Sequence, residues 1–309
     1  MNHDRRPIRR RPTWLSSTLV VLTLVSLTQD AASELLYPLL PLFLTGVLAA
    51  PPVVLGIVEG LADATAGVVR WFAGRWSDRR GRKPFIGAGY GLAAVGKAVV
   101  AGAVGWPMVL AGRVTDRFGK GLRSAPRDAL IASSVPSESL GRAFGFHRMG
   151  DSLGAVIGPL IGLLALSVVD GDIRAAMWWA VVPAVVSVGL TLFVREHRPG
   201  PTVPTTPTRD DHAPPSPEFR RVVAVLVVIA LVNFSDVLLL LRLVDLGFST
   251  TEVVVAYVLF NAVYTLGSYP AGALADRWPK NTVYAVGLAA FAVGYLGLGF
   301  AHRGGGVYP

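Results

Sequence analysis

The sequence contains no cysteine and few charged residues. Without cysteine, the chain forms no disulfide bond, binds no zinc through thiolates and has no catalytic thiol. Charged residues make up 16% of the 309 residues, against roughly 25% in ordinary globular domains. This deficit excludes a water-soluble globular protein and a disordered chain. It also argues against a nucleic-acid-binding protein, despite a formal net charge of +9.

Hydrophobic residues take the place of the missing charges. They make up 52% of the chain, which holds 34 glycines besides. A helix needs about 20 apolar residues to cross a bilayer, and a window of that length predicts nine membrane spans. These are residues 15–47, 52–74, 85–104, 106–130, 141–168, 174–195, 220–245, 251–274 and 282–301. The expected fold class is therefore an all-α membrane protein, a bundle of transmembrane helices.

Basic residues mark every second connection between these spans. The first 14 residues hold five arginines, and the connection after the second span is equally basic, whereas residues 49–52 hold no basic residue. Basic loops tend to stay on the cytoplasmic side of a membrane. We therefore expect a multi-pass protein of the cell (inner) membrane with a cytoplasmic N-terminus. The positive net charge then reflects topology, and no nucleic-acid partner is needed to explain it.

A proline-rich polar stretch divides the chain. Residues 196–218 contain seven prolines among threonines and charged residues, a composition that cannot bury a core and is typical of a flexible linker. The expected organisation has four parts. They are a basic cytoplasmic arm (1–14), a six-helix bundle (15–195), a cytoplasmic linker (196–218) and a three-helix bundle (219–309).

One short pattern, Gly-x-x-x-Asp-Arg, occurs twice at helix ends six spans apart. The two copies are Gly74, Asp78, Arg79 and Gly272, Asp276, Arg277. Asp30 in the first span is similarly echoed by Asp236 in the seventh. Internal repeats of this kind are how many transporters build two facing halves around a central site. The repeat therefore favours a transporter.

These residues resemble motifs of the major facilitator superfamily. The first copy of the repeat and its continuation are similar to the signature between the second and third spans of that superfamily: Gly74, Asp78, Arg79, Gly81, Arg82 and Lys83. The fifth span is similar to the antiporter motif of its drug/proton exporters: Gly154, Gly158, Pro159 and Gly162. In the fourth span Arg117 and Gly121 match a further motif, from which Lys120 and Arg123 depart.

The resemblance implies a fold of two six-helix bundles, with twelve spans in all. This chain ends after the ninth predicted span, so we expect a complete first bundle and about half of the second. The resemblance also implies that the glycine motif limits proton leak in an exporter. The residues alone support a simpler interpretation: glycines at spacing four let helices pack closely.

Both copies of the repeated pattern are expected to form a cytoplasmic gate. Asp78 ends a helix, where its carboxylate can meet the positive N-terminal end of a neighbouring helix. The adjoining basic residues can pair with acids on other helix ends. Such contacts form when the cytoplasmic side is closed and break when it opens. The alternative is that the basic residues only fix the topology.

Ionisable residues inside spans are candidates for function, because an unpaired charge in a membrane is costly. The candidates for a central cavity and for proton coupling are Asp30, Glu34, Glu59, Asp63, Arg113, Asp116, Arg117 and Asp236. Our hypothesis is that Asp30 or Glu34 carries the coupling proton, with Arg113 or Arg117 as its counter-charge. For His147 and Asp151 in the fifth span, a structural ion pair and a functional role are equally good interpretations, and Lys97 has no explanation from the sequence.

The function favoured by these observations is proton-coupled efflux of a small organic molecule by alternating access. The alternatives are a proton-linked importer and a non-transporting fragment of a transporter. The five histidines lack metal-ligand spacing and no nucleophile–base–acid set is visible, so we expect no enzyme activity, no metal and no cofactor. The expected partners are a small-molecule substrate, protons and the lipid bilayer, with no requirement for an oligomer.

Overall fold

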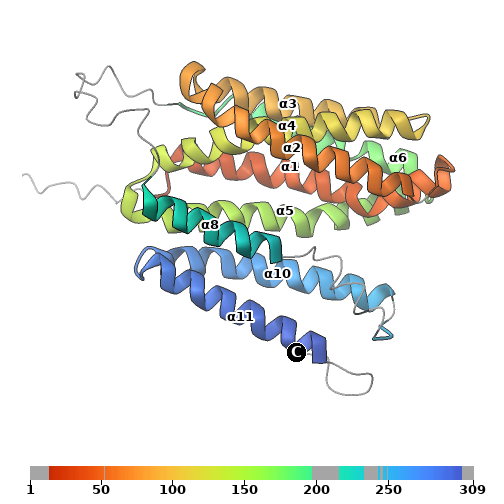
Figure 1. The fold of residues 1–309 in the computed structure, drawn as a ribbon. Coiled ribbons are helices and arrows are strands. Elements are labelled where there is room, and N and C mark those ends of the chain that lie inside the picture. The colour runs from red at the N-terminus through yellow and green to blue at the C-terminus, as the bar shows by residue number, and fades with distance from the viewer. Residues whose placement is uncertain are drawn as a thin grey trace, which may run out of the picture. The chain divides into compact units, whose positions relative to one another are not determined.

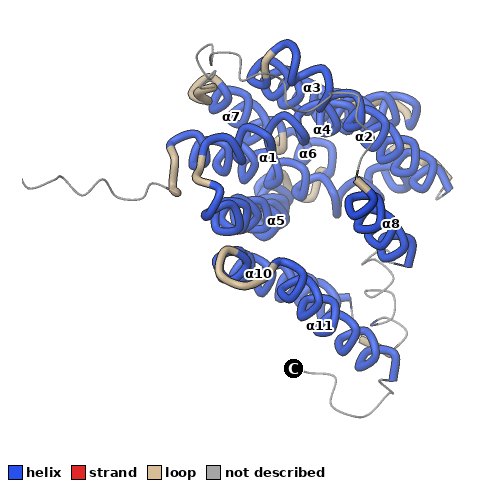
Figure 2. The backbone as a smooth tube through the Cα atoms, turned by 60° about the vertical axis from the view of Figure 1, so that its left-hand side comes forward, coloured by secondary structure: helices blue, strands red, loops and turns tan. Residues whose placement is uncertain are grey.

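The structure, a computed structural model, describes residues 14–51, 53–196, 216–232, 243, 246–248 and 250–300, and these residues are helical almost throughout. The longer helices are α1 (Ser17–Leu42), α2 (Val53–Arg80), α3 (Arg82–Ala101), α4 (Trp106–Ser134), α5 (Leu140–Val168), α8 (Pro217–Val232), α10 (Thr250–Ala275) and α11 (Lys280–Phe300). The shorter ones are η1 (Phe43–Val47), η2 (Ser137–Ser139), α6 (Ile173–Trp178) and α7 (Val181–Thr191). Figure 2 shows no strand in the part that is described. The predicted all-α class is confirmed.

The helices coincide with the nine predicted spans. The first span is formed by α1 and η1, the sixth by α6 and α7, and the second half of the seventh lies outside the described residues. Five helical stretches are long and apolar enough to cross a membrane: residues 17–47, 82–101, 137–168, 173–191 and 280–300. Of the other helices, α2 and α4 are longer than most of these but carry more charged residues.

The chain forms two compact units. The first comprises residues 1–196 and 259–286, and the second comprises residues 197–258 and 287–309. The first boundary falls at the start of the predicted linker. The grouping of residues 259–286 with the first unit was not anticipated from the sequence. In the second unit, α8 begins where the Ser216 hydroxyl accepts a hydrogen bond from the backbone N–H of Phe219, at 3.2 Å.

In the first unit, helices α1 to α5 run alongside one another (Figure 1). Helix α4 packs against α2 and α3, whereas α1 packs against α5 and α7. Contacts between distant segments identify one end of this bundle. The Ser16 hydroxyl donates to Ser134 Oγ at 3.0 Å, and Thr18 donates to the Arg195 carbonyl at 3.1 Å. We call this the basal end, because α1, α3 and α5 begin there.

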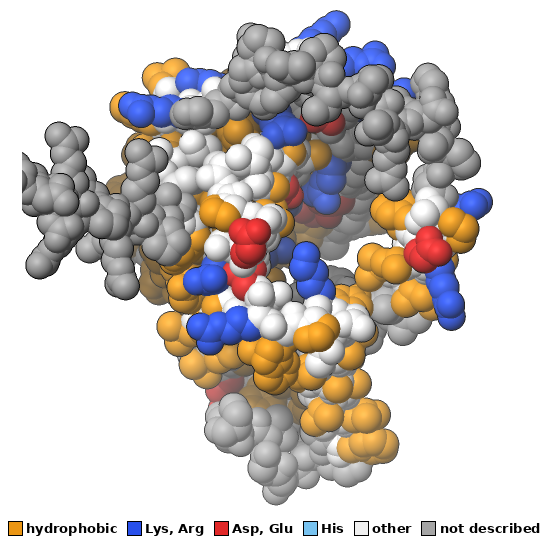
Figure 3. Space-filling model, turned by 90° about the vertical axis from the view of Figure 1, so that its left-hand side faces the viewer, with side chains coloured by type: hydrophobic (Ala, Val, Ile, Leu, Met, Phe, Trp, Pro, Cys, Tyr) orange, Lys and Arg blue, Asp and Glu red, His pale blue; other side chains and the backbone are white. Residues whose placement is uncertain are grey.

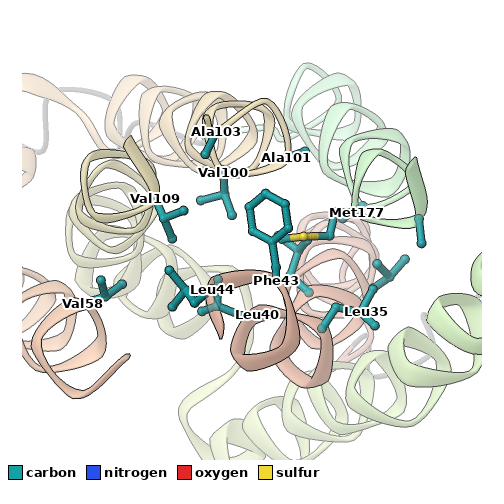
Figure 4. Close-up of a cluster of buried hydrophobic side chains, with 14 of the residues drawn as sticks. Leu35, Leu40, Phe43, Leu44, Val58, Val100, Ala101, Ala103, Val109 and Met177 are labelled. Atoms are coloured by element: carbon teal, nitrogen blue, oxygen red, sulfur yellow. The ribbon is translucent and has the colours of Figure 1, made fainter. Parts of the chain in front are cut away.

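The opposite end of the bundle is filled by apolar side chains. Figure 4 shows Phe43 and Leu44, at the end of the first span, between Val100 and Val109 of α3 and α4 and Met177 of α6. All five side chains are almost fully buried. Burial of a large apolar side chain is worth about 1.5–3 kcal/mol. This core holds the helices together away from the polar groups described below.

Large apolar side chains also cover the outside of the bundle. Leu24, Leu163 and Phe193 are among many that are exposed. Helices of a membrane protein turn such residues toward lipid tails. This distribution of exposed apolar side chains is typical of a membrane protein.

The basal end, in contrast, is polar. Figure 3 looks onto this end and shows several Lys and Arg side chains with a few acidic ones between them. The turn between α2 and α3 consists of Gly81 alone, whose φ is 93°. This left-handed conformation strains residues that carry a Cβ. The glycine lets two spans follow one another without a loop.

Candidate functional site

Charged side chains of α2 and α4 form a paired cluster inside the bundle. Arg113 donates from Nε to Glu59 Oε1 at 2.8 Å and from Nη2 to Oε2 at 2.6 Å. Two parallel bonds between a guanidinium and a carboxylate form a strong and directional ion pair. Arg117, one turn further along α4, lies 3.1 Å from Asp63 and 3.9 Å from Glu59. The two arginines therefore hold α2 and α4 together.

Lys97 completes this cluster from α3. Its Nζ donates to Asp116 Oδ1 at 2.8 Å, and both side chains are at most 3% exposed. The other oxygen of Asp116 lies 3.6 Å from Arg113 and 3.9 Å from Arg117. We call the six residues the paired cluster: Glu59, Asp63, Lys97, Arg113, Asp116 and Arg117. Its three cations and three carboxylates balance.

Glycines allow α3 and α4 to approach closely enough for this contact. A Cβ on Gly96 would lie 2.6 Å from the Gly112 carbonyl and 2.9 Å from Asp116 Cβ. A Cβ on Gly112 would lie 2.7 Å from the Gly96 carbonyl. Real Cβ atoms essentially never come this close to another atom. The short helix-to-helix distance places Lys97 beside Asp116.

A second group of polar side chains lies toward the basal end, between α1, α3, α4 and α5. Arg127 donates from Nη1 to Ser26 Oγ at 3.0 Å, and the Tyr90 hydroxyl lies 3.0 Å from the same oxygen. The ring nitrogens of His147 lie 3.5 Å from Thr23 Oγ1 and from Ser26 Oγ. These last contacts are long for hydrogen bonds. The imidazole is therefore held loosely.

Several buried polar atoms of this group have no hydrogen-bond partner among the described residues. They are Arg123 Nη1, Asp151 Oδ1 and Gln29 Nε2. Arg123 instead lies over the Tyr90 ring, 4.4 Å from its centre. The nearest basic groups to Asp151 are His147 and Arg148, at 3.7 and 3.8 Å. Buried polar atoms are nearly always satisfied, so we call this second group the open polar group. In the paired cluster Asp116 Oδ2 and Arg117 Nε also lack a hydrogen bond, but each lies within 4 Å of an opposite charge.

Asp30 belongs to the open polar group and lies against α5. A Cβ on Gly154 would be 3.1 Å from Asp30 Cβ and 2.5 Å from the Leu27 carbonyl. Gly158 is similarly close to Glu34 Cβ, at 2.9 Å. The fifth-span glycines thus bring α5 against the two carboxylates of α1. Gly162 packs more loosely, and the half-buried Pro159 lies inside α5.

The charged groups that act on Asp30 are Asp151, Lys120, Arg123 and Arg127. The sequence hypothesis named Arg113 or Arg117 as the counter-charge. The structure instead gives these two arginines to Glu59, Asp63 and Asp116. The reason is helical geometry. Arg113 and Arg117 lie on α4 up to four turns before Arg127, the residue that reaches α1.

A cavity of about 650 Å³ opens beside Asp151. Its walls are α4, α5 and residues 264–275 of α10, all within the first unit. Asp128, His147 and Arg148 line it together with Tyr264, whose ring centre lies 5.9 Å from the Arg148 guanidinium. The carboxylate of Asp151, although 8% exposed, therefore borders a space large enough for a small molecule.

The second copy of the repeated pattern lies beside this cavity, and its Gly272 lines it together with Gly141. Asp276 accepts hydrogen bonds from the backbone N–H of Gly141 at 2.6 Å and of Arg142 at 3.0 Å, and from Arg142 Nε at 3.0 Å. A carboxylate at a helix N-terminus satisfies free N–H groups and complements the helix dipole. Gly272 packs directly on the backbone at Gly141 and Gly145.

The first copy has different contacts. The Asp78 side chain is mostly exposed, and its ion pair within the described part of the chain is with Arg82, at 3.5 Å. Arg82 also donates to the Ala129 carbonyl at 3.0 Å, and Lys83 Nζ donates to the Leu192 carbonyl at 3.0 Å. Arg79 is exposed, and Gly74 packs against Ala125. These contacts tie α3 to α4 and α7.

A carboxylate not singled out from the sequence caps α3. Glu196 accepts from the backbone N–H of Arg82 at 2.8 Å and from that of Lys83 at 3.1 Å. In the sequence, Glu196 opens a polar linker and looks solvated. The signal that identifies it is the pair of free N–H groups that follow Gly81. Asp236 and most of the predicted linker lie outside the described residues.

The described residues hold no group of three His, Asp or Glu side chains that could bind a metal ion.

Comparisons with known proteins agree with this architecture. The family model of the major facilitator superfamily matches residues 22–307. An uncharacterized MFS-type transporter of Methanocaldococcus jannaschii is 28% identical over 295 residues, which cover 93% of this chain and 73% of the archaeal protein. An uncharacterized protein of Mycobacterium bovis is 29% identical over 185 residues, 59% of this chain and 44% of its own length.

A third similar protein has a more informative name. The multidrug resistance protein MdtH of Photorhabdus laumondii is 35% identical over 127 residues, which cover 41% of this chain and 31% of MdtH. The chain thus spans less than half the length of the mycobacterial and MdtH relatives. The family match extends over nearly all of its residues. The chain belongs to the major facilitator superfamily of membrane transporters.

Proposed function

We propose that the protein exports a small organic molecule in exchange for protons, by alternating access. The observation that carries this proposal is the Asp276 contact with the start of α5. It joins the second copy of the repeat to the first bundle through charge-assisted hydrogen bonds, which can break and re-form without unfolding a helix. Opening of this contact would expose the cavity between α5 and α10 to the basal side, which we propose is cytoplasmic.

The coupling carboxylate in this proposal is Asp30. It lies in α1, where the positive charges of Lys120, Arg123 and Arg127 act on it. It also contacts the glycine face of α5, so a movement of α5 changes its surroundings. The similarity to MdtH supports export of organic compounds, because that protein is named for multidrug resistance.

Transport by the purified chain in liposomes tests the proposal. The probes are ethidium, rhodamine 6G and carboxyfluorescein, with a pH gradient that is imposed and then collapsed with nigericin. We expect accumulation of at least one dye in acid-interior vesicles, and its loss when the gradient collapses. Accumulation in alkaline-interior vesicles would show proton-linked import instead. Equal dye movement with and without the gradient would contradict proton coupling.

The contact itself is tested with spin labels. Because the chain has no native cysteine, cysteines placed at Phe144 and Ala271 on opposite walls of the cavity are its only thiols. Asp276→Asn removes a charge-assisted interaction worth about 1.5–3 kcal/mol. We therefore expect the population with longer distances between the two labels to increase about tenfold or more relative to the population with shorter distances. An unchanged distribution would show that Asp276 is not a latch.

A further inference from the structure

The proposed function leaves open how a proton reaches Asp30. Residues of α1, α4 and α5 surround Asp30, and the cavity lining does not include it. Asp151 does line the cavity, and its charge acts directly on Asp30. Gly154, three residues after Asp151 on the same helix, has its backbone against Asp30. Asp151 is therefore a carboxylate that both lines the cavity and acts on Asp30.

Two features of Asp151 suit proton exchange. Its Oδ1 has no hydrogen-bond partner in the described part of the chain, so one acceptor position is open in a buried carboxylate. His147 lies one turn earlier on α5, with Nε2 3.7 Å from that oxygen. This distance is too long for a hydrogen bond, but a small rotation of either side chain would close it. Asp151 lies 3.8 Å from Arg148, and His147 lies 3.5 Å from Thr23 Oγ1 and from Ser26 Oγ, and all three distances are long for a hydrogen bond.

We propose that Asp151, assisted by His147, carries protons between this cavity and Asp30. A proton from cavity water binds Asp151 Oδ1 and passes to the Asp30 carboxylate, and it leaves by the same route, so only O–H bonds, and an N–H bond where His147 takes part, form and break. His147 accepts or returns the proton at Nε2. This proposal rests on the proposed function and names the path of its coupling ion.

The groups that face this path come from every helix packed against it. They are Asp30 on α1, Tyr90 on α3, Lys120, Arg123, Arg127 and Asp128 on α4, Arg148 on α5 and Tyr264 on α10. Arg127 is engaged by Ser26 and Asp128, and Arg148 by the Tyr264 ring. Their positive charges compensate the two carboxylates without closing the open position on Asp151. Release of Asp276 from α5 would expose that position to the basal side.

Infrared spectroscopy during a pH jump tests this path on the full chain in lipid vesicles. The readout is the C=O stretching band of protonated carboxyl groups, and the Asp30 contribution is the part lost in Asp30→Asn. In Asp151→Asn, we expect this contribution to grow about 100-fold more slowly than in the wild type. Loss of a proton-transfer group slows a reaction by about 100-fold at the lower end of the usual range. Asp151→Glu should restore much of the rate, and His147→Gln should slow it less.

The control is Asp170→Asn, which removes an exposed carboxylate at φ 51°, a conformation that Asn tolerates. It should leave the Asp30 rate unchanged. A thermal unfolding midpoint of Asp151→Asn that matches the wild type separates the effect from misfolding. An unchanged Asp30 rate in Asp151→Asn would overturn the relay alone. Gradient-independent dye movement by the wild type would overturn the proposed function, whatever the bands show.

Discussion

The paired cluster and the open polar group both include buried charged residues of α4. Toward the start of α4, Arg113, Asp116 and Arg117 all have oppositely charged partners on α2, α3 or α4 itself. Asp116 Oδ2 and Arg117 Nε lack a hydrogen bond, but each lies within 4 Å of an opposite charge. Toward the end of α4, Arg123 Nη1 has no hydrogen-bond partner among the described residues, and neither has Asp151 Oδ1 on α5. Closely paired buried charges contribute to a fixed structure, whereas a buried group with an unmade hydrogen bond can still form one with a ligand, a water molecule or a proton.

This difference suggests a division of labour. The paired cluster holds α2, α3 and α4 as one rigid piece. The open group lies where α1, α5 and α10 meet α4, next to the cavity and the Asp276 contact. A site that must change its protonation as the surrounding helices move cannot have every polar atom satisfied in one state. The contrast between the two regions can be tested by three sets of variants.

The largest expected effect is in the paired cluster. Lys97→Met leaves Asp116 as a buried charge without its closest partner, and breaking one side of a buried pair costs about 3–5 kcal/mol. We expect a strongly lowered unfolding midpoint for the protein in detergent. The double variant Lys97→Met, Asp116→Leu should recover most of this loss, because no charge is then left unpaired. A single variant as stable as the wild type would contradict the structural role.

The glycine contact that frames the open group should give an intermediate effect. In Gly158→Ala the new Cβ would lie 2.5 Å from the Ala31 carbonyl and 2.9 Å from Glu34 Cβ. Overpacking of this kind costs about 1–3 kcal/mol, measured as the shift of the unfolding midpoint. Gly91→Ala in α3 is the matched control, because its Cβ would meet nothing within 4 Å. Equal midpoints for the two variants would argue against close packing of α1 and α5.

The smallest effect on stability is expected at Asp151. Asp151→Asn removes a buried charge whose Oδ1 has no hydrogen bond, so little favourable interaction is lost. We expect the unfolding free energy to change by less than about 1 kcal/mol and to rise if it changes at all, as is common where function requires an unfavourable arrangement. Destabilisation comparable to that of Lys97→Met would show that the two regions do not differ.

The fold was predictable because it follows from apolar runs of bilayer length, and these runs lie on helical residues wherever the structure describes them. The glycine motif likewise indicated that the fifth span packs closely on another helix, and the structure shows that this helix is α1. Pairings across helices were not predictable in the same way. Lys97 was unexplained because its partner, Asp116, is 19 residues away on another helix, and spacing within one helix says nothing of the rotation of its neighbour. Glu196 was missed for a similar reason, since its partners lie at the start of α3.

The paired cluster also bears on how the chain enters a membrane. α1, α3 and α5 each lie in a stretch that meets the length and hydropathy of a membrane span, whereas α2 and α4 carry five of the six charges of the cluster and α3 carries Lys97. Each Asp, Lys or Arg near the centre of a span opposes insertion by about 2.5–3.5 kcal/mol. Neutralisation of Glu59 by Arg113 requires both helices to be present. We therefore expect α2 to enter the lipid only after α4 has been synthesised, so that α2, α3 and α4 insert together.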